Sequence, residues 1–342
     1  MTKTAHTPFV CALDSGGSKT LCWILDAKGE LLAWQNGLGA ANIHDEQILQ
    51  GIIAPILQAA LQNAGLQAEQ ITAVNVSLGG LNELELARTL TNLLPASKVQ
   101  VFRESSGEAV FVAAPHWGFD IALMAGTGVV ALGINPAGLR RSCGGWGALM
   151  HDLGGGHSVG QAALRGLAEA VDFRHPETML LPALAAELPF KRHLQDCHFL
   201  QKPIKQMSYE ERLCLKNAFK AALPQLDRRA VAGLFPVVCA CAEKKDPFSR
   251  QLLEQAAHSL VKICIALASD LHLSAPRIAL LGGVFKAGET MLGVFQRLMQ
   301  NDFPAAQAQL TDFSQIKGSA LLALQLAGIK MDAAIVAKIR RR

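Results

Sequence analysis

The stretch FVCALDSGGSKT at residues 9–20 decides how this chain begins to fold. An apolar run from Phe9 to Leu13 ends at Asp14, a glycine turn follows, and a second apolar run starts at Leu21. The pattern predicts two antiparallel strands joined by a tight turn, with a carboxylate where the first strand ends. Successive N–H groups in such a turn can bind an anion, and the Asp can hold a hydrated divalent cation. A plain glycine hairpin explains the same residues equally well, and the Walker loop spacing is absent.

Outward from this hairpin, strand-like and helix-like segments alternate. The first series is predicted to contain strands at 9–13, 21–25, 31–34, 71–78 and 99–102, and helices at 45–64, 83–94 and 107–114. A second series starts with strands at 121–124, 129–134 and 140–143, continues with helices from 158 to 271, and ends with strands at 277–281 and 307–310 and helices at 287–299 and 316–327. Both series join short strands through glycine turns, which indicates an α/β protein built from two similar halves.

Composition excludes several classes of protein. The 342 residues are 50% hydrophobic and 18% charged, so the chain is not disordered and is long enough for two domains. A net charge of +4 does not predict a nucleic-acid partner, and the basic tail at 338–342 is expected to be solvated. The apolar stretches at 231–242 and 263–268 are too short to cross a bilayer, and eight scattered cysteines without a CxxC pair indicate a reduced cytoplasm.

Two further glycine turns follow predicted strands. AGTG at 125–128 places Thr127 between two glycines, and LLGG at 280–283 closes a later strand. Each could be a simple turn, but glycine also lets the main chain approach a ligand closely, and ligands of open α/β sheets bind at the carboxyl ends of strands. Three such turns in one chain favour a nucleotide-binding cleft between two domains.

The order of DSGGSKT, AGTG and LLGGVFKAGE resembles the phosphate-1, phosphate-2 and adenosine motifs of the actin, sugar kinase and heat-shock ATPase superfamily. Within it, GLGAANIH at 37–44, CGGWGALMHDLGGG at 143–156 and KGSALLAL at 317–324 resemble the N-acetylglucosamine kinases grouped with the BadF/BadG/BcrA/BcrD ATPases. The resemblance implies two ribonuclease H-like, actin-like ATPase domains with mixed βββαβα sheets on either side of a nucleotide cleft. We expect them at 1–118 and 119–342, the second with a helical insertion at about 158–270.

The resemblance also implies a role for particular residues. Asp14 is expected near Mg²⁺. The nucleotide is expected to contact Gly16, Gly17, Ser18, Lys19, Gly126, Thr127, Gly128, Gly282, Gly283 and Lys286. The sugar is expected to contact Asn42, Gly145, Trp146 and Asp152. From the residues alone, Trp146 is better explained as a packing anchor among glycines.

The chain departs from the family pattern mainly on the sugar side. Glu104 stands where the kinases place an Asp that accepts the hydroxyl proton, and its extra methylene changes the reach of the carboxylate. Leu153 replaces a polar Glu, Val129 a common serine, and Leu81 a frequent Asp. The predicted catalytic carboxylate is Glu104, with Asp152 as the second candidate.

The resemblance therefore implies an ATP- and Mg²⁺-dependent kinase acting on the hydroxyl of an amino sugar, with N-acetylglucosamine as the expected substrate. The partner is a small sugar, with no nucleic acid and no membrane, and a homodimer is the assembly considered. Two alternatives stay open: an activator ATPase of the BadF type, which delivers electrons through an iron–sulfur cluster, and a sugar- or nucleotide-binding protein with weakened catalysis. Suitably placed cysteines would be needed for the first.

Overall fold

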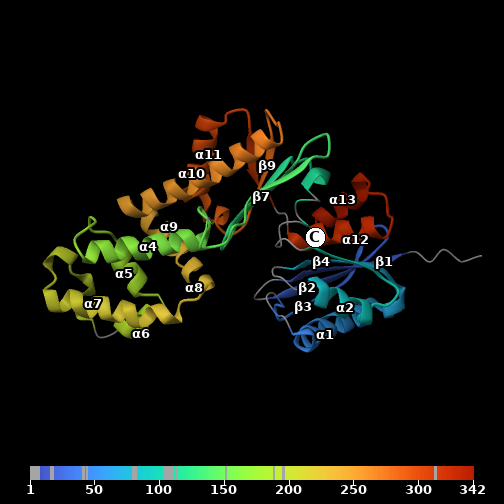
Figure 1. Cartoon of the computed structure of the whole chain (residues 1–342), viewed down its shortest axis with the longest axis horizontal. Helices are drawn as coiled ribbons and strands as arrows, with labels where there is room; N and C mark the ends of the chain where they lie inside the picture. Colours follow the sequence, from blue (N-terminus) through green and yellow to red (C-terminus); the bar gives the residue numbers. More distant parts are fainter. Residues whose placement is uncertain are drawn as a thin grey trace, which may run out of the picture. The chain divides into compact units, whose positions relative to one another are not determined.

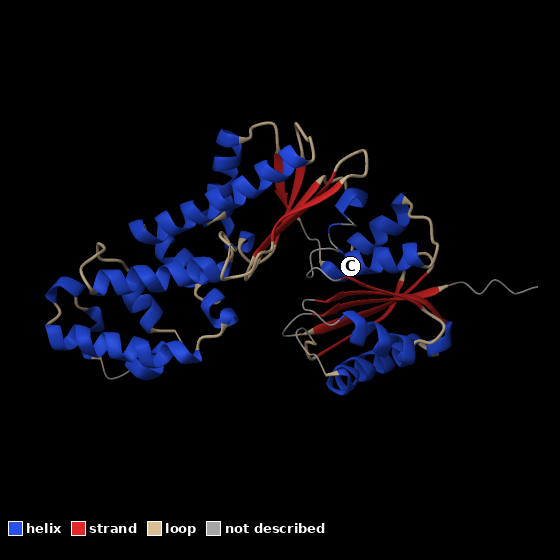
Figure 2. Cartoon of the chain, viewed as in Figure 1, coloured by secondary structure: helices blue, strands red, loops and turns tan. Residues whose placement is uncertain are grey.

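The computed structural model describes residues 8–15, 19–40, 43, 45–78, 83–102, 109, 111, 114–150, 152–187, 189–194, 197–311 and 314–342. The chain divides into two compact units, one formed by residues 1–122 with 311–342 and the other by residues 123–310. Each unit contains a five-stranded sheet with helices, which confirms the predicted α/β class with two mixed sheets (Figures 1 and 2).

The sheet of the first unit has the strand order β3-β2-β1-β4-β5. Strands β1, β2 and β3 form an antiparallel meander, whereas β4 and β5 run parallel to β1. Their bounds are Phe9–Ser15, Thr20–Asp26, Leu31–Gly37, Ile71–Leu78 and Lys98–Phe102. The strand predicted from residues 9–13 is therefore the central one, which explains why its side chains are apolar on both faces.

Helices cover both faces of this sheet, as Figure 1 shows. Cys11 and Leu13 pack on one side with α1 (Glu46–Ala64) and α2 (Glu83–Leu93). Val10 and Ala12 alternate to the other side, where they pack with α12 (Gln315–Leu326) and α13 (Ala333–Arg340). All four side chains are fully buried, as expected for a strand between two helical layers.

The C-terminal segment differs from what the sequence predicted. Residues 311–342 belong to the first unit and not to the second, because α12 packs its apolar side chains against β1 and β4. The basic tail is not simply solvated either. It forms the end of α13, Ile339 is fully buried, and Lys338 and Arg342 form ion pairs with Glu30 at 2.8 and 3.2 Å.

The sheet of the second unit has the order β10-β9-β6-β7-β8. Strands β9 and β10 are parallel, and β7 and β8 are antiparallel. The bounds of β6 to β10 are Ile121–Ala125, Val129–Ile134, Arg140–Gly144, Arg277–Leu281 and Gln307–Leu310. The AGTG turn thus joins β6 to β7, and the Gly282-Gly283 turn follows β9, which lies next to β6.

Helices α4 to α11 belong to this unit, and those from α4 to α10 lie between β8 and β9 in the chain. They are α4 (Gly156–Val171), α5 (Leu180–Ala185), α6 (Phe190–Leu194), α7 (Tyr209–Ala222), α8 (Arg228–Ala232), α9 (Phe235–Glu243), α10 (Pro247–Asp270) and α11 (Leu292–Asp302). Residues 228–243, within the stretch predicted to be helical, form two helices, because Pro236 has no N–H to continue the α8 hydrogen-bond ladder and instead occupies the first turn of α9.

Helix α10 is the one helix of the described residues that is long and apolar enough to cross a membrane by length and composition. Its apolar face is packed within the unit, where Leu253, Leu260 and Leu267 are among its buried residues. It also contacts β7, β8, α9 and α11. The apolar character of α10 is therefore that of a core helix.

Candidate functional site

Asp14 lies near the end of β1, between Leu21 of β2 and Ser77 of β4. Burial raises the pKa of its carboxyl from the ordinary 3.8 to about 7, and the charge of Lys19 opposes this rise. Within the described residues, the Asp14 carboxylate accepts no hydrogen bond. A desolvated carboxylate without a partner suits a hard divalent cation such as Mg²⁺, which prefers oxygen ligands. Gly16, Gly17 and Ser18 lie outside the described residues.

A chain of hydroxyl groups fixes the strand ends beside Asp14. The Ala40 N–H donates to Ser15 Oγ at 3.1 Å, the two hydroxyls of Ser15 and Thr20 are 2.7 Å apart, and Thr20 Oγ1 donates to the Leu38 carbonyl at 2.8 Å. Because Thr20 uses its proton on Leu38, Ser15 donates to Thr20. The chain ties the first hairpin to the segment that leads toward Asn42, itself outside the described residues.

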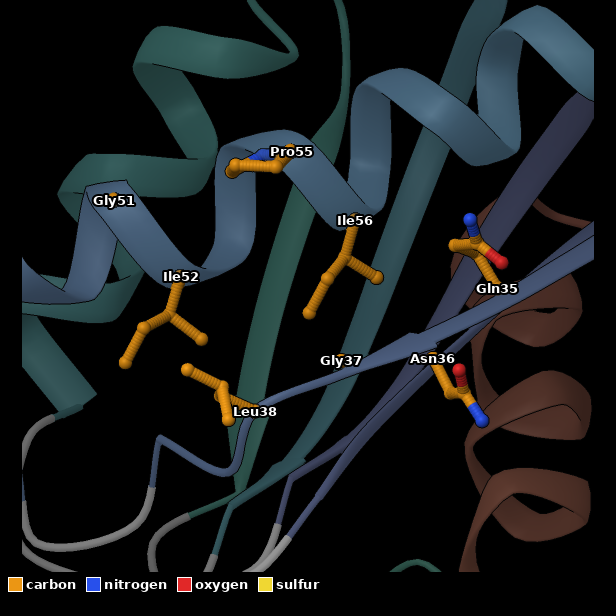
Figure 3. Close-up of a pocket in the computed structure, with 8 residues that line it drawn as sticks. All are labelled: Gln35, Asn36, Gly37, Leu38, Gly51, Ile52, Pro55 and Ile56. Atoms are coloured by element: carbon orange, nitrogen blue, oxygen red, sulfur yellow. The ribbon is translucent and has the colours of Figure 1, made fainter.

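Next to this segment, the first unit has a pocket of about 290 Å³ between β3 and α1. Figure 3 shows Ile52 and Ile56 extending from α1 toward Gly37 and Leu38. Pro55 has no N–H, so the carbonyl four residues earlier in α1 loses its usual helix partner. The pocket thus combines an apolar floor with polar groups. Its lining is Gln35, Asn36, Gly37, Leu38, Gly51, Ile52, Pro55 and Ile56.

In the second unit, the AGTG turn is held by main-chain hydrogen bonds. The Gly156 N–H donates to the Gly126 carbonyl at 2.7 Å, and the His157 N–H donates to the Thr127 carbonyl at 3.1 Å. Both donors belong to the first turn of α4, whose leading N–H groups have no partner inside the helix. The turn is therefore docked onto the positive end of α4, with Thr127 exposed.

The Gly282-Gly283 turn packs against the same strand end. Gly282 has a φ of +99°, and a Cβ there would collide with the Ala125 carbonyl, which accepts a hydrogen bond from the Val284 N–H at 3.1 Å. Gly283 and Lys286 are exposed beside it. The structure thus brings together two of the three predicted nucleotide-binding turns, at adjacent strands of one sheet.

The loop after β8 follows the AGTG turn closely. The Gly145 N–H donates to the Val129 carbonyl at 2.7 Å, and Gly144, Gly145 and Gly147 all have positive φ, which glycine adopts at little cost. Trp146 is 65% exposed. It does not serve as the packing anchor that its residue type alone suggested.

Asp152 is held on both of its oxygens. Its side chain is 4% exposed, Oδ1 accepts from the Gly147 N–H at 3.2 Å, and Oδ2 accepts from Arg228 Nη2 at 2.5 Å. A Cβ at Gly128 would meet both the carboxylate and the guanidinium, so the pair lies directly against the AGTG turn. Sequence reasoning missed Arg228, because its position in the helical insertion carries no signal beyond the helix start at Asp227.

One predicted catalytic residue, Glu104, lies outside the described residues. Of the other expected site residues, Asp14 and Lys19 lie in the first unit, and the AGTG turn, the Gly282 turn, Lys286, Trp146 and Asp152 lie in the second. None of the eight cysteines, all of which the structure describes, forms a disulfide. No group of three or more metal-binding side chains occurs among the described residues.

The sequence of this chain matches a known protein family along nearly its whole length. The model of the BadF/BadG/BcrA/BcrD ATPase family matches residues 13–323. An N-acetylmuramic acid/N-acetylglucosamine kinase of Clostridium acetobutylicum is 22% identical, covering 86% of this chain and 92% of that protein. An N-acetyl-D-glucosamine kinase of Dictyostelium discoideum is 24% identical, covering 91% and 96%.

Solved structures share the fold. A candidate N-acetylglucosamine kinase of Chromobacterium violaceum superposes with a TM-score of 0.69 at 23% identity, covering 94% of this chain and 100% of that chain. A ROK hexokinase of Thermus thermophilus gives 0.54 at 17% identity, covering 93% and 98%. At these identities the likeness concerns the two-domain kinase fold.

Proposed function

Since the chain belongs to the BadF/BadG/BcrA/BcrD ATPase family, we propose that it transfers the terminal phosphoryl group of ATP to a hydroxyl of an amino sugar, N-acetylglucosamine first among them. The observation that carries this proposal is the match to two curated amino-sugar kinases along 86% and 91% of this chain. The AGTG turn and the Gly282-Gly283 turn of the second unit support it independently. Thr127 and Gly283 are exposed in these turns, so phosphates can approach their backbone groups.

Phosphoryl transfer requires positioning and charge neutralisation more than covalent chemistry. In the second unit, the AGTG turn is assigned to the phosphates and the Gly282-Gly283 turn with Lys286 to the adenosine. In the first unit, Asp14 holds Mg²⁺, with Gly16 to Lys19 as further phosphate contacts. Bound Mg²⁺ neutralises charge on the transferred phosphoryl group. The desolvated Asp14 carboxylate supports this assignment, because a cation offsets the cost of its burial.

We assign the proton-accepting role to Glu104. A general base needs a free carboxylate oxygen within hydrogen-bond reach of the substrate hydroxyl. Asp152 uses both oxygens on Gly147 and Arg228, which leaves Glu104 as the better candidate. The exposed Trp146 ring, with Gly145 and Asn42, is assigned to the sugar, because its flat apolar surface can cover a sugar ring. Asp152 is assigned an indirect role at the sugar, because it holds the loop at Gly147 that follows Trp146.

A panel of sugars tests the proposal. Purified enzyme with Mg-ATP is expected to release ADP only when an amino sugar is present, and Glu104→Gln is expected to lose about 100-fold or more of that rate. Glu69→Gln, an exposed carboxylate of the same unit, is the matched control and is expected to retain the rate. ADP release at the same rate with and without every sugar would instead favour the activator ATPase. Binding of sugar or nucleotide without ADP release would favour a binding protein with weakened catalysis.

The compartment and assembly stay proposals as well. Eight cysteines that form no disulfide support a reducing compartment such as the cytoplasm. A homodimer is retained as the assembly to measure by light scattering.

A further inference from the structure

Arg228 is fixed in place by two helices. It is the first residue of α8, where Asp227 Oδ1 caps the helix by accepting from the Ala230 N–H at 2.7 Å. Helix α8 packs against α4, and the carbonyl of Ala232 lies close to Gly156 at the start of α4. Since α4 in turn donates to the carbonyls of the AGTG turn, the backbone at Arg228 and that turn form one packed assembly within the second unit.

The guanidinium of Arg228 has donors to spare. Asp152 Oδ2 is the one hydrogen-bond acceptor that it contacts among the described residues, whereas a guanidinium carries five N–H donors. The Arg228 side chain is 49% exposed, and its partner Asp152 is 4% exposed. The carboxylate therefore holds Nη2 of the guanidinium beside Gly128, while the Arg228 side chain as a whole stays about half exposed.

Charge makes this arrangement more than a structural ion pair. A buried carboxylate next to a turn that receives a polyphosphate would repel it, since like charges at short range are costly in a partly buried site. Arg228 neutralises that carboxylate and also presents a planar fork of donors, the geometry that matches phosphate oxygens.

We propose that Arg228 binds the terminal phosphate of the nucleoside triphosphate at the AGTG turn, and that Asp152 is the positioning residue that orients its guanidinium. This inference rests on the proposed function for its ligand, a nucleoside triphosphate. It adds a phosphate-binding residue from the helical insertion, outside all three glycine motifs. It also explains why a carboxylate can be buried next to Gly128.

The direct test is Arg228→Met, which keeps the length of the side chain and removes the donors. Calorimetry without sugar is expected to show a loss of about 10- to 100-fold in affinity for a non-hydrolysable ATP analogue, the scale of a hydrogen bond to a charged group. The affinity for ADP is expected to change by less than about 3-fold, because ADP has no terminal phosphate at that position. Arg229→Met, the exposed neighbour on the same helix, is the matched control and leaves both affinities unchanged.

A purely structural role for Arg228 predicts different results. If Arg228 served only to neutralise Asp152, Arg228→Met would weaken both nucleotides equally, and adding Asp152→Asn would restore them. If Arg228 binds the terminal phosphate, the double variant of Arg228→Met with Asp152→Asn still binds the ATP analogue little more tightly than ADP. Asp152→Asn alone, which keeps Arg228, retains a larger preference for the ATP analogue. This second comparison contains no unpaired buried carboxylate, so it stays informative if Arg228→Met alone fails to fold.

The outcomes also separate this inference from the proposed function. Wild-type protein that phosphorylates amino sugars while Arg228→Met binds the ATP analogue normally would overturn the role of Arg228 alone. If Arg228→Met no longer binds the ATP analogue more tightly than ADP, but the wild type phosphorylates no sugar, the kinase proposal alone would be overturned. Wild-type protein that does not bind the ATP analogue would overturn both.

Discussion

The two units repeat a strand, a glycine turn and a return strand, yet they treat the carboxylate beside that turn in opposite ways. In the first unit Asp14 has no hydrogen-bond partner among the described residues, and burial raises its pKa to about 7. In the second unit Asp152 is more deeply buried but is paired with Arg228 and the Gly147 N–H. Among the described residues, Asp14 thus lacks the hydrogen-bonded ion pair that Asp152 already has, and the charge of Lys19 offsets its burial only in part.

The turns themselves are also held differently. Side-chain hydroxyls of Ser15 and Thr20 link the adjoining ends of β1 and β2, whereas main-chain groups of α4 and the Gly282 turn hold the AGTG turn. Two similar elements can therefore take different roles because their surroundings differ. In our proposal Asp14 binds a cation, whereas Asp152 is already paired with Arg228 beside the phosphate-binding AGTG turn.

The largest effect is expected from Asp14→Asn. The amide fits the same space but cannot hold Mg²⁺ as a carboxylate does. We expect the sugar-dependent rate to fall roughly a thousandfold, the scale of the several kcal/mol that a metal ion contributes to a transition state. Steady-state kinetics at saturating Mg-ATP measure this. If Asp14→Asn retains most of the sugar-dependent rate, the reaction does not depend on a cation at Asp14. The proposed difference between Asp14 and Asp152 would then be wrong.

The stability of the same variant should change in the other direction. The pKa of Asp14 in the folded protein, about 7, lies above the ordinary 3.8, so the folded state binds more protons between these values. Wild-type stability without Mg²⁺ therefore falls as pH rises from 4 to 7, and Asp14→Asn escapes this loss. Melting temperatures without Mg²⁺ should favour the variant increasingly toward pH 8. Asp26→Ala is a useful contrast, because it removes the oxygen that accepts from two turn N–H groups at 2.9 Å, and this loss should cost stability without affecting activity.

The main-chain support of the second turn is tested by Gly282→Ala. A Cβ at this positive φ would collide with the backbone of Ala125, which cannot move without shifting the AGTG turn. We expect the free energy of unfolding to fall by about 3 kcal/mol or more, a sum of backbone strain and overpacking. Gly283→Ala is the matched control for stability, since its Cβ would enter open space, and it should change stability by less than about 0.5 kcal/mol. Equal melting temperatures for the two variants would contradict this account.

The sequence allowed the strands and turns of both units to be predicted, because the decisive signals are local. The apolar run before Asp14, the AGTG sequence and the Gly282-Gly283 pair are local patterns, and they correspond to β1 and to two turns of the described residues. The ion pair between Asp152 and Arg228 was not readable, because 76 residues separate its partners and only tertiary packing brings them together. The same reason hid the return of α12 and α13 to the first sheet.

The hydroxyl chain at the ends of β1 and β2 is tested by Thr20→Val, which preserves the shape of the side chain. The change leaves the Ser15 hydroxyl without its acceptor and the Leu38 carbonyl without its donor. We expect a loss of about 1–3 kcal/mol in the free energy of unfolding by denaturant titration, the cost of unsatisfied buried groups. Thr91→Val removes an exposed hydrogen bond within α2 and should cost less than about 0.5 kcal/mol. A Ser15→Ala, Thr20→Val double variant should lose less than the sum of the single variants, because both act on one network. Strict additivity would indicate that the two hydroxyls act separately.

The smallest effect concerns the charge balance at the second turn, and His157 reports it. Burial and then the charge of Arg228 lower the pKa of His157 below the ordinary 6.5, while Asp152 raises it. Titration of the imidazole by NMR should therefore show a higher pKa in Arg228→Met and a lower one in Asp152→Asn, and both changes should be small because the ring is partly exposed. Because the folded pKa lies below the unfolded value, this histidine destabilises the protein as pH falls below 6.5, and Arg228→Met should weaken that dependence. His116 of the first unit, whose pKa is lowered by burial alone, should not respond to either change. If the pKa of His157 shifts in the same direction in both variants, the shifts reflect a structural change of the AGTG turn and not the two charges. Asp152 would then not be neutralised by Arg228, and its contrast with Asp14 would be lost.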